Sequence, residues 1–314
     1  MAIADYAYRL VQHYTKVINP YILIDELSST FAYIGVAEKD TLTSAAAWKI
    51  FRVFRQGGLY TIECAGTGGV ADQIWDNRVS LFTTGLLGNS YSVNFDGVND
   101  FVDFGNNYTF EISQAFSISF WVKPNNIAAT RCLISKCSDD ASVIGYNIQH
   151  IVTSGRIQIQ MRTAIPASPH VFTTALTAGV WQHIVLTYSG NSNMNGNRAY
   201  RNAVVGDTPS SSAMTGTFLN TASFIVGARN TVFPFVGNID EVSVWDKALS
   251  AAEVTELYNT GQPADLNDHS AFANLQSWWR MGDSDTFPTI LDHKGSINGT
   301  MTNSTAADIE ADVP

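Results

Sequence analysis

Short runs in which apolar and polar residues alternate dominate the chain between about Tyr91 and Gly261. FSISFWVKP at 116–124 and RIQIQMR at 156–162 place an apolar side chain at every second position. Such alternation predicts strands with one buried face, because successive side chains of a strand point to opposite sides. Turn clusters rich in Gly, Asn, Ser and Pro separate the runs. The pattern therefore predicts two antiparallel sheets packed face to face.

The stretch FVGNIDEVSVWDKALSAAEVTELYNTG at 235–261 predicts a strand followed by one short helix. The strand covers 239–245. Ser250 is a favourable N-cap, and Glu253 three residues later completes a capping box. Gly261 is a suitable C-cap. The predicted apolar face of the helix consists of Leu249, Val254 and Leu257.

The segments on either side of this region have different patterns, which divides the chain into residues 1–87, 88–262 and 263–314. The first segment is β-rich, and its WKIFRVF and LYTIECA runs alternate around Gln56-Gly57-Gly58, as in a hairpin. In the last segment, LQSWWRMGD and INGTMTN predict a pair of strands.

Composition and charge narrow the range of partners. Charged residues make up 15% of the 314 residues, and 18 Lys and Arg stand against 28 Asp and Glu, for a net charge of -10. No basic stripe is present, so we expect neither nucleic acid nor an anionic membrane as a partner. Residues 1–20 lack the pattern of a secretory signal. No apolar run approaches the roughly 18 residues of a membrane span.

The three cysteines are Cys64, Cys132 and Cys137. Cys132 and Cys137 bracket LISK, which predicts a strand. Five steps of extended chain span roughly 16 Å, too far for a disulfide between them. We expect reduced thiols in a protein made in a reducing cytoplasm.

The middle segment resembles a known family through four motifs in the expected order: VNFDGVNDFVDFG, FSISFWVKP, WQHIVLTYSG and FVGNIDEVSVWDKALSAAEVTELYNTG. They are similar to the laminin-G-like and pentraxin-like branch of the concanavalin A-like jelly rolls. The resemblance implies an all-β, two-sheet jelly-roll sandwich. One departure is AYRNAVVG, where the family usually carries an acidic hairpin turn.

The outer segments resemble tailed-bacteriophage structural proteins, through AYIGVAEKDTLTSAAAWKIFRV and IWDNRVSL near the start and LQSWWRMGDSDTFPTI and GSINGTMTN near the end. This resemblance implies a homo-oligomeric virion surface protein. Residues 1–87 would dock on other virion proteins, and the lectin-like sandwich would face host-surface or environmental glycans. Both a capsid decoration or head fibre and a tail-associated protein fit. The alternative is a free-standing bacterial carbohydrate-binding or polysaccharide-degrading protein.

The family resemblance also implies a structural calcium ion. Carried over to this sequence, its ligands are Asp96 and Asp240, with Asn99 and Asp100 as further oxygen donors from the loop. The alternative is that Asp96 forms a turn with Gly97 while Asp240 binds a backbone group.

Catalysis and glycan binding leave weaker signals. Retaining glycosidases need two carboxylates roughly 5 Å apart, and no predicted strand places such a pair on one face. Asp240 and Glu241 are adjacent, so they are expected on opposite faces, and we predict no enzyme activity. Several aromatic rings lie in or near predicted loops, but none can be assigned to a ligand: Tyr146, His150, His170, Phe172, Tyr200 and Phe233.

Overall fold

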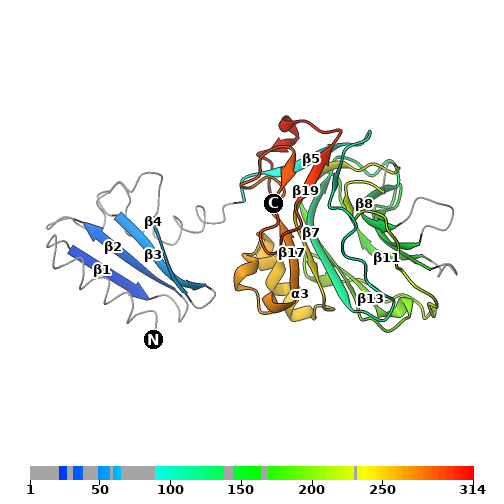
Figure 1. Ribbon diagram of the computed structural model, residues 1–314, viewed down its shortest axis with the longest axis horizontal. Coiled ribbons are helices and arrows are strands. Elements are labelled where there is room, and N and C mark those ends of the chain that lie inside the picture. The colour runs from blue at the N-terminus through cyan, green and yellow to red at the C-terminus, as the bar shows by residue number, and fades with distance from the viewer. Residues whose placement is uncertain are drawn as a thin grey trace. The chain divides into compact units, whose positions relative to one another are not determined.

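The computed structural model divides the chain into two compact units, residues 1–88 and 89–314 (Figure 1). In the second unit it describes residues 89–137, 144–163, 169–229 and 232–314. In the first unit it describes the backbone of four strands, and the rest of the predicted docking segment 1–87 lies outside the described residues.

The strands of the first unit form one antiparallel sheet in the order β1-β2-β3-β4. They are β1 (Tyr21–Glu26), β2 (Phe31–Ala37), β3 (Lys49–Gln56) and β4 (Leu59–Cys64). Gln56 of β3 pairs with Leu59 of β4, as the predicted hairpin requires.

The second unit is an all-β sandwich of two sheets, as predicted. We call the first of them sheet I. In spatial order, sheet I consists of β11 (His170–Ala175), β10 (Arg156–Arg162), β9 (Gly145–His150), β8 (Arg131–Cys137), β15 (Ile225–Val226), β6 (Phe101–Asp103), β19 (Gly299–Thr302) and β18 (Thr289–Ile290).

Sheet II packs against sheet I. In spatial order, it consists of β14 (Val204–Val205), β13 (Asn197–Arg201), β12 (Gln182–Tyr188), β7 (Phe116–Pro124), β16 (Val236–Trp245), β5 (Ser92–Asp96) and β20 (Ile309–Glu310). β17 (Leu275–Trp279) pairs with the second half of β16.

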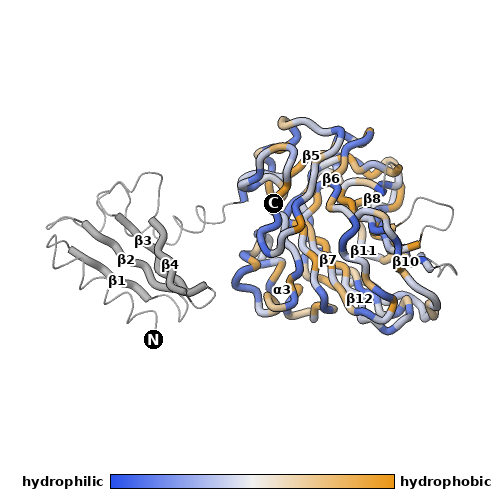
Figure 2. The backbone as a smooth tube through the Cα atoms, viewed as in Figure 1, coloured by the Kyte–Doolittle hydropathy of each residue, from blue (hydrophilic) through white to orange (hydrophobic). Residues whose placement is uncertain are grey.

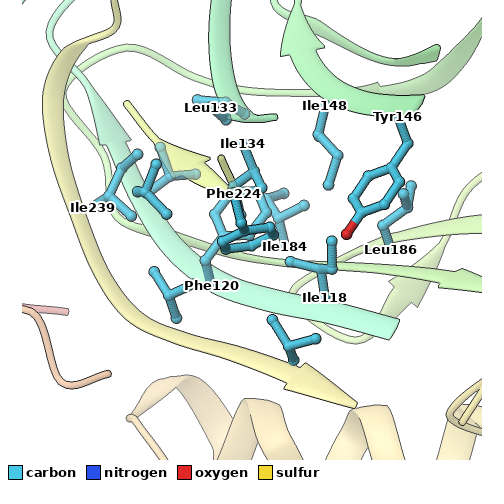
Figure 3. Packing of buried hydrophobic residues seen from close by; sticks show 14 of the residues in the cluster. Ile118, Phe120, Leu133, Ile134, Tyr146, Ile148, Ile184, Leu186, Phe224 and Ile239 are labelled. Atoms are coloured by element: carbon cyan, nitrogen blue, oxygen red, sulfur yellow. The ribbon is translucent and has the colours of Figure 1, made fainter. Parts of the chain in front are cut away.

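The main core lies between the sheets and follows the predicted alternation. Ile118 and Phe120 of β7 meet Ile134 and Ile148 of sheet I in one buried cluster (Figure 3). Apolar stretches recur along strands such as β7 and β8, and hydrophilic residues recur in the connections (Figure 2). Burial of these side chains is the dominant favourable term in folding.

A second apolar cluster covers the outer face of sheet II. Val254 and Leu257 of helix α3 (Ala251–Tyr258) pack against Trp245 and Trp278 of β16 and β17. The predicted capping box between Ser250 and Glu253 is present. The predicted C-cap is wrong, because Asn259 takes the left-handed conformation that ends the helix. No helix in the described part of the chain is long and apolar enough to cross a membrane.

This cover explains why the predicted exposed face of β7 is buried. Ser117 and Ser119 point away from the main core, yet both are buried. The Ser117 hydroxyl donates to the carbonyl of Lys247, just before α3. Sheet II is therefore covered on both faces, and the alternation within β7 could not reveal the second layer.

Residues 263–314 belong to the same compact unit as the sandwich. The two strands predicted to pair, β17 and β19, do not pair with each other, and β19 pairs with β18 on one side. Instead β17 joins sheet II, β19 pairs with β6 of sheet I, and β20 pairs with the edge strand β5. Short 3-10 turns connect the described strands: η2 (Met194–Gly196), η3 (Asn259–Gly261), η4 (Leu266–Asp268), η5 (Phe272–Asn274) and η6 (Ala306–Asp308).

Candidate functional site

The outer face of sheet I carries a row of amide side chains on β9 and β10. Asn147 pairs across the strands with Gln160, and Gln149 pairs with Gln158. The residues between them belong to the main core, so strand alternation turns all four amides to the opposite face. We call these four residues the amide strip.

Hydrogen bonds hold the amide strip in one arrangement. The Gln158 Oε1 atom accepts from Gln149 Nε2 at 2.6 Å and from Gln160 Nε2 at 2.9 Å. Asn147 Nδ2 donates to Gln160 Oε1 at 3.4 Å. The orientation of Gln160, which is half-buried and accessible, is therefore set by buried neighbours.

One acceptor of the strip has no hydrogen-bond partner among the described residues. Asn147 is 1% exposed, and its Oδ1 atom is buried without a hydrogen bond. Buried polar atoms are almost always satisfied by protein, water or ligand. This oxygen is therefore an acceptor available to a bound molecule or to a bridging water.

Basic and aromatic groups flank the amide strip. Arg156 and Arg162 are the first and last residues of β10, and both lie on the face of the amides. At the β8 side, the guanidinium carbon of Arg229 lies 4.7 Å from the ring centre of Phe233. Phe233 is 41% exposed. The site thus combines fixed amides, cationic donors and one accessible ring. The amide strip itself contains no carboxylate.

The aromatic residues considered from the sequence are placed differently from the expectation. Tyr146, His150 and Phe172 lie in strands of sheet I and are buried. Of the rings considered, Phe233 alone among the described residues is prominently exposed. The amide strip was visible in the sequence as glutamines at alternate positions of RIQIQMR, but that pattern also fits a solvated strand face.

The four residues predicted for calcium do not converge. Asp96 and Asp100 lie together, since Asp100 Oδ2 accepts from the Asp96 backbone nitrogen at 3.1 Å. Asn99 is in the same exposed loop. Asp96 pairs with Val236, whereas Asp240 lies four residues further along β16, roughly 13 Å away.

The bonds that these aspartates make also argue against a shared site. Asp96 Oδ1 accepts from the Val98 backbone nitrogen, as in the alternative turn interpretation. Asp240 is fully buried and bonds Asn89 and the Glu241 backbone nitrogen. In the described residues, no group of three or more His, Cys, Asp or Glu is placed to hold a metal ion. The structure does not bring the four predicted ligands to one point, and calcium binding stays a prediction.

Asp240 and Glu241 correct the prediction that they point to opposite faces. The register between β16 and β7 shifts between Asp240 and Ser243, and Glu241 has a φ of 49°. Ile239 and Val242 both face the main core. The extra residue of this β-bulge therefore turns both carboxylates to the outer face of sheet II.

A buried ionic network forms around the bulge. Arg280 Nε donates to Glu241 Oε1 at 3.1 Å, and Arg280 Nη2 donates to Asp283 Oδ2 at 3.0 Å. The indole nitrogen of Trp278 donates to Glu241 Oε2. Asn89 Nδ2 donates to Asp240 Oδ2 at 2.6 Å, which ties the start of the sandwich to this network.

Burial shifts the titration of these groups. It raises the pKa of Asp240 well above its usual value, with the charge of Glu241 adding to the effect. Burial also raises the pKa of Glu241 to about 7, although Arg280 opposes the shift. Both carboxylates are buried, and Glu241 is engaged by Arg280 and Trp278, so a substrate has little access to them. We therefore assign the pair a role in the stability of the fold.

Comparison with known proteins gives one family match. Residues 96–255 match the profile of a family described as Concanavalin A-like lectin/glucanases superfamily. No curated protein matches the sequence.

Solved structures give likenesses at low identity. A Bacteroides ovatus protein described as a candidate carbohydrate binding protein is 13% identical, with a TM-score of 0.52 over 96% of this chain and 84% of that chain. A heptameric SAP-like pentraxin from Limulus polyphemus is 14% identical, with a TM-score of 0.45 over 68% of this chain and 95% of that chain. At these identities the likeness concerns the fold alone.

The ionic network predicts a pH-dependent stability. Because the folded state raises the pKa of Asp240 and Glu241, it binds protons that the unfolded state has released. The contribution of these groups to the free energy of unfolding should be fully present below about pH 4.5, the usual pKa of a glutamate such as Glu241. It should be lost as the pH rises through about 7, the pKa of Glu241 in the folded protein. Thermal unfolding across this range measures the slope.

Asp240→Asn should flatten that slope, because it removes one of the two titrating carboxyl groups. The variant should still fold, since the Asn89 amide can turn its oxygen toward the new amide. Glu256→Gln removes a carboxylate that is 38% exposed on α3 and serves as the matched control. Parallel profiles for the wild type and Asp240→Asn would contradict the assignment.

Proposed function

This chain belongs to the concanavalin A-like lectin/glucanases superfamily, and from that premise we propose that it binds carbohydrate along the amide strip of sheet I. The observation that carries the proposal is the set of interlocked amides on β9 and β10. Sugar hydroxyls both donate and accept, and so do amide side chains.

The position of the strip supports recognition of a saccharide. Its residues are on paired strands, so their side chains are held in place before a ligand arrives, which lowers the cost of ordering on binding. The unpartnered Asn147 Oδ1 offers one acceptor toward a hydroxyl. Half-buried Gln160 is the member that a ligand reaches first.

Phe233 supports the same proposal from the edge of the site. Its ring is 41% exposed, and Arg229 lies against it. An exposed ring next to hydrogen-bonding groups provides an apolar surface on which a sugar ring can stack.

We further propose that the sandwich binds without hydrolysis. Glycoside hydrolysis uses two carboxyl groups on either side of the scissile bond, and the amide strip contains none. The adjacent carboxylates of Asp240 and Glu241 are buried on the other sheet, where Arg280 and Trp278 engage Glu241.

The context in which the sandwich is displayed is a separate proposal. The resemblance of the flanking motifs to tailed-phage structural proteins supports a homo-oligomeric virion surface protein, on the head or the tail. The other candidate is a free-standing bacterial carbohydrate-binding protein, which the fold supports equally well.

A glycan array with the full chain tests carbohydrate binding. We expect a defined set of glycans to bind. Gln160→Ala should weaken binding roughly tenfold, the effect of one lost hydrogen bond of good geometry. Gln276→Ala removes an exposed amide from β17 of the other sheet and should change nothing. A blank array, or equal losses in both variants, would overturn the proposal.

Electron microscopy of purified phage particles labelled with an antibody to this chain tests the virion proposal. Label at regular positions on heads or tails is the expected result. Absence of label from every particle would leave the free-standing alternative.

We also propose that the loop of Asp96 binds a calcium ion, independently of the glycan site. Calorimetric titration after chelation should release heat, and the melting temperature should rise. Asp96→Asn should abolish both effects, while Asp240→Asn should retain them, because Asp240 lies at the far end of the strand pairing. No heat and no gain in melting temperature would rule calcium out.

A further inference from the structure

The outer face of β10 has a symmetric order of side chains. Arg156, Gln158, Gln160 and Arg162 occupy successive positions on this face, while Ile157, Ile159 and Met161 between them lie in the main core. Two guanidinium groups thus flank two amides along one strand. The six steps from Arg156 to Arg162 span roughly 20 Å, which is longer than a single sugar ring.

The arginines of this face differ from the buried Arg280 in their charged neighbours. Among the described residues, no carboxylate forms an ion pair with Arg156, Arg162 or Arg229. The Nε atoms of Arg162 and Arg229 are buried and make no hydrogen bond. Arg280, by contrast, binds two carboxylates.

This arrangement is unexpected for the chain as a whole. The net charge is -10, so a random surface would supply more carboxylates than arginines. An arginine presents a planar fork of donors that fits a carboxylate with two parallel hydrogen bonds. Unpaired arginines beside fixed amides therefore suit a ligand that carries both carboxylates and hydroxyls.

We propose that the ligand of the amide strip is an acidic oligosaccharide that lies along β10, with its sugar carboxylates on Arg156 and Arg162. The proposal rests on the carbohydrate-binding function proposed above and specifies its ligand class. The glutamines between the arginines bind the hydroxyls of the intervening sugars. Arg229 lies near Cys132 of β8, the strand next to β9, where it adds to the positive potential.

Matched neutral and acidic probes test the ligand class with the full chain. Oligogalacturonate and sialyllactose serve as acidic probes, and methyl-esterified oligogalacturonate and lactose are their neutral counterparts. At least one acidic probe should bind roughly tenfold or more tightly than its counterpart. Its affinity should fall as salt is raised, because the charges are partly exposed.

Charge variants separate site recognition from bulk attraction. Arg162→Gln should remove most of the preference for the acidic probe and reduce the salt dependence. Arg198→Gln removes the same charge from β13 of the other sheet, where the guanidinium donates to the carbonyls of Asn195 and Asn197, and it should leave both unchanged. Equal effects of the two variants would overturn the proposal.

The outcomes also distinguish this inference from the function on which it rests. Equal binding of neutral and acidic partners, with loss in Gln160→Ala, would overturn the acidic ligand and keep carbohydrate binding. No binding of any of these probes, together with a blank glycan array, would overturn both.

Discussion

The sandwich depends on β16, whose two edges hold three other strands. β7 pairs along one edge, while β5 and then β17 share the other. The change from β5 to β17 falls at the bulge of Glu241, so a positive charge is needed just after β17 to meet the carboxylates turned outward there. Arg280 supplies it. Removing that partner would leave buried carboxylates uncompensated, which is strongly destabilising.

The cover over sheet II leaves the two outer faces of the sandwich with different roles. α3 and the turns after it bury the outer face of sheet II under a second apolar cluster. β8 and β11 lie on the side of the sandwich away from α3 (Figure 1). In the part of the chain that the structure describes, no second apolar cluster lies over sheet I, and the outward positions of β9 and β10 carry amides and arginines. This difference is the reason we propose sheet I as the ligand-binding face.

Alternation and capping made the fold predictable. In β7 and β10 every second residue belongs to the core, and the Ser250–Glu253 box was legible from spacing alone. The bulge at Glu241 was not legible, because a left-handed glutamate has no sequence signature and one inserted residue reverses which face each neighbour occupies. The glutamines of RIQIQMR were visible in the sequence. Their fixed orientation could not be predicted, because Gln149, which orients Gln158, belongs to the neighbouring strand β9. A local sequence pattern does not show whether residues from distant segments come together. It therefore could not show that Asp96 and Asp240 lie apart.

The construction of the strip also bears on how tightly one site can bind. Three of its four amides are buried, and they fix Gln160 more than they contact a ligand themselves. Phe233 adds one exposed ring, so little apolar surface is available for burial. A site made chiefly of exchanged hydrogen bonds gains modest affinity, because each bond replaces one to water. Specificity is less affected, since a ligand that leaves an oriented amide or arginine unpaired loses the full desolvation of that group. A weak but selective site is most effective when many copies face one surface, where avidity multiplies affinity without new contacts. The proposed homo-oligomeric display would supply that avidity.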